Sequence, residues 1–310
     1  MTNIVGTKKF ILGGAQIGLD YGIANVCGLP TRIEVEELLS FASRSNILAI
    51  DTAAAYGNSE EKIGEAFSSL PSCKPIITKL EPLSGFENES NELLGKSIDK
   101  SVMTSIARLK VSSLDTLLLH RAEQLHARDG FIWERLLAHK QDGVIRRLGV
   151  SVQTPEELIS ALDAIDVSVI QFPYNLFDHR WDEAFNLVST IKKARPLELH
   201  VRSVLLQGLI TSSDSDLWRK ANVPDSDEIN SWIDQTVGSL GRIDRVDLCI
   251  AFVSSRELID GIVMGVDNID QLQMNLSYFE RPPLDQSQFE MIVKERPTLR
   301  ENTLNPALWS

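Results

Sequence analysis

Four side chains that can donate, accept or hold a proton stand at or just beyond the ends of apolar runs. Asp51 ends ILAID, Tyr56 follows it in DTAAAYG, Lys79 closes IITKL and His120 closes DTLLLH. A lysine inside an apolar run is costly to bury unless it is paired, and Asp51 is the available partner. An ammonium group beside a phenol stabilises the phenolate and so makes the phenol a stronger acid. Brought together, these residues would form a tuned general acid.

Each of the four also has an ordinary structural interpretation. Asp51 would cap a helix, and Tyr56 would pack as a loop aromatic. Lys79 would extend its ammonium group to solvent, and His120 would be a hydrogen-bonded core imidazole. A catalytic interpretation therefore depends on a fold that brings the ends of these runs to one place.

Short apolar runs rich in β-branched residues recur along the chain, and segments of helical period separate them. The predicted strands are 10–14, 47–51, 75–80, 115–120, 145–151, 167–173, 199–205 and 261–266. The predicted helices are 34–45, 60–70, 94–110, 132–143, 155–164 and 182–194. Thr154 and Pro155 supply a start signal for the helix 155–164, and Gly143 ends the helix before it.

This alternation predicts an α/β fold, a single (β/α)8 TIM barrel of residues 1–310 with parallel strands covered by helices. A doubly wound open sheet is the competing architecture, but GGAQIG after the first strand lacks the GxGxxG spacing. Extra helices are expected in 211–245 and 246–256, before the eighth strand, and 281–310 is expected to form a tail over the barrel surface or its mouth. In such a barrel the chemistry lies where the carboxyl ends of the strands meet.

The charge balance excludes several classes of partner. With 31 Lys and Arg against 43 Asp and Glu, the net charge of −12 repels nucleic acid and anionic membranes. The sequence contains no run of about 18 apolar residues, which is the length that a membrane-spanning helix needs. Cys27, Cys73 and Cys249 form no CxxC pair, which argues against a disulfide framework and a zinc site. We expect a cytoplasmic monomer or small homo-oligomer without nucleic-acid or membrane partners.

The order and spacing of the four residues resemble the catalytic pattern of the aldo-keto reductases. The resemblance continues through GVS (149–151), QFPYN with Gln171, SVLLQGLI (203–210) and MGVDNIDQLQMN (264–275). It implies a (β/α)8 barrel and hydride transfer between a nicotinamide cofactor and a carbonyl or alcohol, with no metal.

The resemblance also implies a role for each residue. Tyr56 is the proton donor in reduction and the base in oxidation; Lys79 strengthens that acid and Asp51 holds Lys79. His120 hydrogen-bonds the same carbonyl oxygen. The implied cofactor contacts are Gly13, Gly14, Ala15, Ser151, Gln171, Arg202, Ser203, Leu205, Gln207, Gly265, Val266, Asp267, Gln271 and Asn275. Val152 stands where the family often has Asn, and Arg202 where many members stack an aromatic ring on the nicotinamide.

The last of these segments favours NAD(H) over NADP(H). Family members that prefer the phosphorylated cofactor usually carry a Lys-Ser pair and an Arg that hold its 2′-phosphate. This chain has Gly265 and Val266 for the pair and Gln271 for the Arg, and Asp267 adds a negative charge. The alternative is that another loop supplies the missing cations, with Arg202 and Arg256 as candidates.

The loop 18–28 carries polar groups that suit a hydroxylated substrate. Asp20, Tyr21 and Asn25 lie in it, and Tyr174 in QFPYN is a further candidate contact; an ordinary capped surface loop is the alternative. We predict an NAD(P)-dependent oxidoreductase that acts on a sugar or sugar-like small molecule. The alternatives are an NADPH-dependent, broad-specificity aldehyde and ketone reductase, and a non-catalytic cofactor-binding subunit with a regulatory or redox-sensing role.

Overall fold

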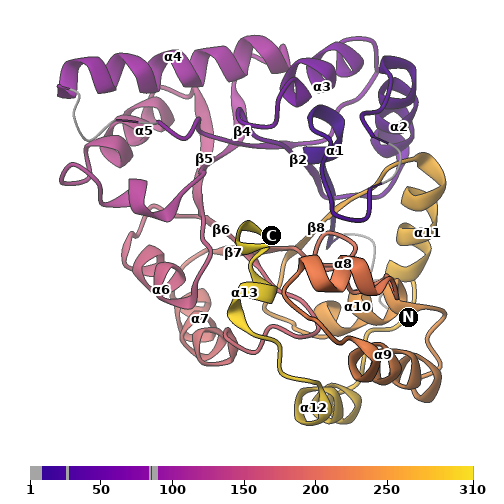
Figure 1. The fold of residues 1–310 in the computed structure, drawn as a ribbon. Helices are drawn as coiled ribbons and strands as arrows, with labels where there is room; N and C mark the ends of the chain where they lie inside the picture. Colours follow the sequence, from indigo (N-terminus) through magenta and orange to yellow (C-terminus); the bar gives the residue numbers. More distant parts are fainter. Residues whose placement is uncertain (1–8, 26–27, 84, 86–89, 310) are drawn as a thin grey trace, which may run out of the picture.

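A computed structural model describes residues 9–25, 28–83, 85 and 90–309. Eight parallel strands close into a barrel in chain order, and β8 pairs with β1 (Figure 1). The predicted (β/α)8 TIM barrel is thereby confirmed. Its strands are β1 Phe10–Gly13, β2 Ala49–Asp51, β3 Ile76–Lys79, β4 Leu114–Leu119, β5 Ile145–Ser151, β6 Val169–Pro173, β7 Glu198–Arg202 and β8 Gly261–Gly265.

Helices surround the barrel and cover the outer face of its strands (Figure 1). Those of the first seven connections are α1 Ala15–Gly18, α2 Arg32–Arg44, α3 Ser59–Phe67, α4 Asn91–Leu109, η3 Ala122–Leu125, α5 Phe131–Gln141, α6 Pro155–Asp163, α7 Asp182–Ala194, α8 Ser215–Lys220, α9 Asp227–Ser239 and α10 Arg245–Ser254. After β8 come α11 Ile269–Phe279, α12 Gln286–Glu295, α13 Glu301–Leu304 and η4 Pro306–Leu308. The extra helices expected before the eighth strand are present as α8, α9 and α10. Within the described residues, none of the helices combines the length and apolar character needed to cross a lipid bilayer.

Side chains inside the barrel form a small apolar layer. This layer contains Ile11, Ala49, Ile77, Leu118 and Val169, all of them buried. Because alternate residues of a strand face the same side, the residue two positions further along each strand faces inward at the carboxyl end. Those positions are occupied by Gly13, Asp51, Lys79, His120 and Gln171. The pleat therefore directs four polar side chains toward the mouth of the barrel.

The seventh strand is shorter than the sequence predicts. The expected range of 199–205 was wrong at its end, because β7 stops at Arg202 and Ser203 adopts a left-handed backbone with φ of 60°. Leu206 and Gln207 are also left-handed, with φ of 50° and 56°. Such conformations turn the chain sharply, so 203–208 forms a loop at the carboxyl end of the barrel.

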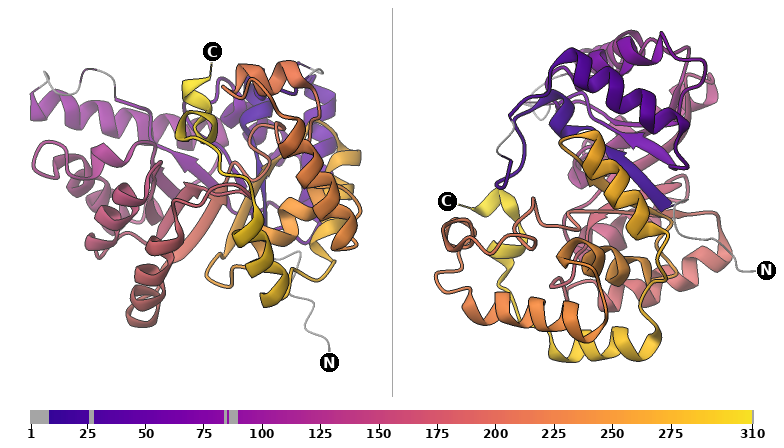
Figure 2. Two further views of the ribbon diagram at one scale, coloured as in Figure 1. Left: turned by 60° about the horizontal axis from the view of Figure 1, so that its bottom comes forward. Right: turned by 90° about the vertical axis from the view of Figure 1, so that its right-hand side faces the viewer.

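The tail contains a helix that its weak periodicity did not reveal. Asp285 caps α12 in a capping box with Gln288, and only Phe289 and Ile292 of this helix are buried. Phe289 stacks on Phe252 of α10 with ring centroids 5.0 Å apart. Figures 1 and 2 show the C-terminal segment crossing the outside of the barrel from α12 to α13. The expected tail over the barrel surface is therefore anchored by aromatic packing.

The N-terminus of α6 follows the start signal in the sequence and offers a test of local stability. Thr154 accepts a hydrogen bond from the backbone N–H of Glu157 at 3.3 Å, and Pro155 occupies the first helical turn. We expect Thr154→Ala to lower the free energy of unfolding by about 1 kcal/mol, because it leaves a helix N–H without its cap. Thr154→Ser should retain most of the stability. Urea unfolding followed by circular dichroism measures both, and equal stability of Thr154→Ala and the wild type would contradict the expectation.

Candidate active site

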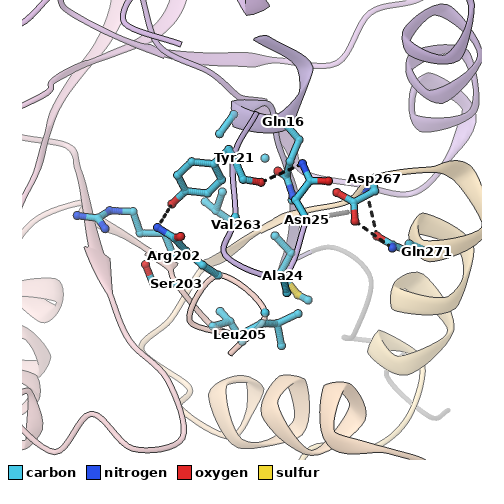
Figure 3. A pocket seen from close by; sticks show the side chains of 18 of the residues that line it. Gln16, Tyr21, Ala24, Asn25, Arg202, Ser203, Leu205, Val263, Asp267 and Gln271 are labelled. Atoms are coloured by element: carbon cyan, nitrogen blue, oxygen red, sulfur yellow. Dashed lines mark hydrogen bonds between the residues drawn. The ribbon is translucent and has the colours of Figure 1, made fainter. Parts of the chain in front are cut away.

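A cleft of about 400 Å³ opens at the carboxyl end of the barrel. The ends of β1, β2, β7 and β8 and the loops after them supply its lining. Figure 3 shows Tyr21 and Arg202 at one side of this cleft and Asp267 and Gln271 at the other. The fold therefore places the cleft where a (β/α)8 barrel supports chemistry.

A buried ion pair lies at the floor of the cleft. Lys79 Nζ is 2.7 Å from Asp51 Oδ2, and the two side chains are 1% and 4% exposed. Lys79 also donates to the carbonyl of Thr52 at 3.0 Å, and Asp51 accepts from Gln171 Nε2 at 2.8 Å. Burial alone would lower the pKa of Lys79, but the adjacent Asp51 carboxylate reverses this and leaves that pKa raised. The Asp51 carboxylate therefore favours the charged ammonium form of Lys79, as the sequence predicts.

Tyr56 and His120 lie beside this pair. Lys79 Nζ is 5.0 Å from the centroid of the Tyr56 ring, and the rings of Tyr56 and His120 meet edge to face at 5.9 Å. Tyr56 belongs to the turn between β2 and α3 and is half-buried. A Cβ atom on Gly18 would lie 1.9 Å from the Tyr56 carbonyl oxygen, so only glycine permits this turn to approach α1. The structure thus brings all four candidate catalytic residues together.

His120 is a neutral imidazole near neutral pH. Burial lowers its pKa to about 4, and the positive charges of Lys79 and Arg202 contribute to the shift. Its Nδ1 atom is buried without a hydrogen-bond partner among the described residues. One ring nitrogen of a neutral imidazole carries a proton, so His120 is able to donate a hydrogen bond to a ligand.

Most of the predicted cofactor contacts line the cleft. They are Gly13, Gly14, Ala15, Arg202, Ser203, Leu205, Gln207, Gly265, Asp267, Gln271 and Asn275. Ser151 and Gln171 pair in register at the ends of β5 and β6 and are buried beside the cleft rather than lining it. Gln171 Oε1 has no hydrogen-bond partner among the described residues. Val266 lines a neighbouring cavity of about 210 Å³ instead.

Of the three predicted substrate contacts, the structure places one in the cleft and two outside it. Tyr21 lines the cleft, and its hydroxyl accepts a hydrogen bond from Gln207 Nε2 at 3.3 Å. Asp20 is exposed outside the cleft, where it accepts from Asn25. The structure does not place Tyr174 at the cleft, because this side chain is fully buried. Its ring packs against Phe185 and Phe252, and its hydroxyl accepts a hydrogen bond from Arg256. The prediction of Tyr174 as a substrate contact was therefore wrong.

Sequence reasoning missed Gln16. Its side chain fills the space above Gly265, where a Cβ atom would lie 1.9 Å from Gln16 Oε1. Gln16 lines both the cleft and the neighbouring cavity. The sequence does contain a signal for this position, because Gln16 is a polar residue that interrupts the apolar run after the first strand.

Neither Arg256 nor the two cysteines that the structure describes contribute a group to the cleft. Cys73 is exposed and Cys249 is buried, and both are free thiols, whereas Cys27 lies outside the described residues. Arg256 binds Asp182 at 2.5 Å and covers the Phe289 ring at 4.4 Å. Arg256 is therefore committed to packing the tail against the barrel, and it is not the missing cation of the cleft.

Comparison with known proteins agrees with this geometry. The sequence model of the Aldo/keto reductase family matches residues 9–295. D-arabinose 1-dehydrogenase of Saccharomyces cerevisiae is 24% identical over 302 residues, which cover 90% of this chain and 84% of the yeast protein. An aldo-keto reductase of Mycobacterium sp. is 30% identical over 138 residues, 44% of this chain and 46% of that protein.

Solved structures show the same fold. The holo form of an aldo-keto reductase from Bacillus halodurans superposes with a TM-score of 0.74 at 19% identity, covering 96% of this chain and 97% of that one. A putative aldo-keto reductase from Pseudomonas aeruginosa gives a TM-score of 0.64 at 21% identity, with 88% and 89% covered.

The depressed pKa of His120 predicts a pH-dependent loss of stability. The unfolded chain takes up a proton at this histidine near pH 6.5, whereas the folded protein does so only near pH 4. The free energy of unfolding therefore falls as the pH falls through this window, by roughly 2 to 3 kcal/mol from this group. His120→Asn lacks a titrating group and should lose less stability. Urea unfolding of both proteins at pH 7 and pH 4.5 tests this, and parallel losses would contradict it.

Proposed function

The chain belongs to the aldo/keto reductase family, and on that premise we propose that it is a nicotinamide-dependent oxidoreductase for sugars or sugar-like hydroxycarbonyl compounds. Within one barrel domain, it would interconvert a carbonyl and an alcohol. The observation that carries the proposal is the buried Lys79 ammonium, paired with Asp51, 5.0 Å from the ring of Tyr56.

We assign proton transfer to Tyr56. When bound, a reduced nicotinamide supplies hydride to the carbonyl carbon. Tyr56 gives its phenolic proton to the carbonyl oxygen, which yields the alcohol, and the phenolate is reprotonated from solvent. The Lys79 ammonium stabilises that phenolate, and Asp51 keeps the ammonium charged and in place. In oxidation the same phenolate accepts the proton of the alcohol.

His120 orients the carbonyl in this scheme. Because its pKa lies near 4, it acts as a neutral hydrogen-bond donor and not as a second acid. A donor aimed at the oxygen that gains negative charge stabilises the transition state more than the ground state. Tyr56 and His120, whose rings are in contact, would thus both hydrogen-bond the oxygen of the substrate carbonyl.

Residues at the floor of the cleft and buried beside it fit a nicotinamide cofactor. Gln171 Oε1 is buried without a partner, and a carboxamide N–H would satisfy it. Ser151, its neighbour in register, offers a second hydrogen-bonding group. Gly13 and Gly14 leave no room for side chains, because Cβ atoms there would approach Gly265 N to 3.0 Å and Asp51 O to 2.9 Å. Both glycines line the cleft without a side chain, so a ring could rest close to their backbone there.

The far side of the cleft favours NAD(H) over NADP(H). Among the described residues that line the cleft, Arg202 is the one lysine or arginine side chain, and it lies opposite Asp267 and Gln271 (Figure 3). Asp267 and Gln271 hydrogen-bond each other at 3.2 Å. A 2′-phosphate at that side would meet a carboxylate, whereas ribose hydroxyls could donate to it. This arrangement supports the predicted NAD(H) preference.

Polar groups around Tyr21 suit a hydroxylated substrate. Tyr21, Asn25 and Gln207 line the cleft together, and they offer a phenol and two amides. A pocket that hydrogen-bonds substrate hydroxyls discriminates strongly against analogues that lack them. The name of the yeast relative, a D-arabinose dehydrogenase, agrees with a sugar substrate for this chain.

Replacement of the proposed proton donor tests the reaction. With aldoses and either cofactor, we expect Tyr56→Phe to lower kcat at least about 100-fold because the general acid is lost. Tyr278→Phe, whose hydroxyl bonds Asp244 outside the cleft, is the matched control and should retain kcat. Nicotinamide absorbance measures turnover. Undiminished turnover by Tyr56→Phe would refute its role, and turnover of apolar aldehydes but of no aldose would favour the broad-specificity alternative.

Cofactor preference is tested by binding. The wild type should bind NADH at least about tenfold more tightly than NADPH, as a phosphate beside Asp267 is disfavoured by about 1.4 kcal/mol. Gln271→Arg should raise NADPH affinity by about tenfold, because it supplies a charged donor. Gln235→Arg, an exposed change on α9, is the control. Isothermal titration measures the dissociation constants, and tighter wild-type binding of NADPH would overturn the preference.

A further inference from the structure

Arg202 carries an uncompensated charge at the edge of the cleft. It is the last residue of β7, and its Nη2 donates to the Val152 carbonyl at 3.2 Å and to Gln153 Oε1 at 2.8 Å. Both acceptors are neutral. Among the described residues no carboxylate forms an ion pair with Arg202, whereas Lys79 pairs with Asp51 and Arg121 pairs with Glu123. Its hydrogen bonds fix the side chain without cancelling its charge.

The charge of Arg202 reaches the reacting groups. Burial lowers the pKa of His120, and the positive charges of Lys79 and then Arg202 lower it further. At Tyr21, burial raises the pKa of the phenol while Arg202 opposes that rise. Arg202 and Tyr56 also line the same cleft. A positive charge on one wall is therefore felt at the groups that would surround a reacting carbonyl.

Adding the fixed charges around Tyr56 leaves one positive charge. The formal charges of Lys79 and Asp51, which lie 2.7 Å apart, sum to zero, and His120 is neutral. The guanidinium charge of Arg202 remains. Any species bound at this centre is therefore selected for carrying less positive charge.

We propose that Arg202 shifts the redox equilibrium of the bound cofactor toward the neutral, reduced nicotinamide and away from the cationic, oxidised ring. The proposal rests on the dinucleotide-binding function proposed above. Hydride transfer requires the nicotinamide ring to lie beside the carbonyl that Tyr56 protonates, and hence within the field of Arg202. The oxidised ring carries one positive charge and the reduced ring carries none, so only the oxidised form is repelled. On the enzyme, this repulsion drives hydride from an alcohol onto the oxidised cofactor.

Coulomb's law sets the scale of the effect. Two unit charges about 6 Å apart in a partly solvated site repel by an amount equivalent to roughly a tenfold change in a dissociation constant. Arg202→Gln removes the charge and leaves a shorter side chain that still carries an amide hydrogen-bond donor. Lysine would retain the charge without the planar guanidinium group.

Binding of both redox forms tests the proposal without turnover. Dissociation constants of the oxidised and reduced dinucleotide are measured by quenching of intrinsic fluorescence, with whichever of the NAD or NADP pairs binds more tightly. The wild type should bind the reduced form several-fold more tightly. Arg202→Gln should lower the ratio of the oxidised to the reduced constant by about tenfold, mainly through tighter binding of the oxidised form. Arg202→Lys should keep the wild-type ratio.

Arg121→Gln is the matched control. Arg121 follows His120 in the chain, but its side chain is 63% exposed and pairs with Glu123 at 3.6 Å. Solvent screens such a charge, so the ratio should change less than about twofold.

The opposing outcomes are distinct. Equal weakening of both redox forms by Arg202→Gln would make Arg202 a simple anchor for the dinucleotide and overturn the proposal. An unchanged ratio together with a raised KM for an acidic aldehyde would assign the charge to a substrate anion, which also overturns it. A wild-type ratio of one or less would refute it even if Arg202→Gln failed to fold. If the wild type bound neither dinucleotide, the proposed function itself would fall, and this inference with it.

Discussion

The buried ion pair between Lys79 and Asp51 is the interaction on which the arrangement of the cleft depends. Removing two charges from water is expensive, and their attraction offsets that cost only when the remaining hydrogen-bonding positions are also satisfied. Here the Thr52 carbonyl accepts from Lys79, and Gln171 donates to the second oxygen of Asp51. The pair consequently links β2, β3 and β6 at the mouth of the barrel. It also supplies a fixed positive charge beside Tyr56 that solvent does not screen.

The barrel brings these groups together through its register and its pleat. Asp51 is opposite Ile77 on the neighbouring strand, so Lys79, two residues further along, faces the same interior space. Strand-borne side chains of this kind are held rigidly, whereas Tyr56 stands on a turn whose position depends on the close approach of Gly18. The rigidly held charges of Lys79 and Asp51 and the position of the turn that carries Tyr56 together define where a proton can be transferred.

Charge is distributed unevenly along the cleft of a protein whose net charge is −12. Arg202 lies on one side of the cleft, and Asp267 lies on the opposite side (Figure 3). In the function proposed above, the two sides would contact different parts of a bound dinucleotide. A positive charge near the reacting ring acts on its oxidation state, and a negative charge at the far side acts against an additional phosphate. The proposed cofactor preference and the proposed redox effect of Arg202 would thus be separable, because they rest on different residues.

The sequence alone predicted the barrel, the approximate positions of its eight strands and the four candidate residues Asp51, Tyr56, Lys79 and His120. Period and strand-end position are local patterns that the (β/α)8 topology converts into proximity. Tertiary structure alone decided the rest. Tyr174 is adjacent in sequence to the end of β6 yet packs in the core, β7 ends at a left-handed Ser203, and α12 buries too few residues to reveal its period. The partners of Gln171 and the absence of a carboxylate beside Arg202 among the described residues depend on strands far apart in the chain. Long-range contacts of this kind fix the electrostatics of the site, and no local pattern encodes them.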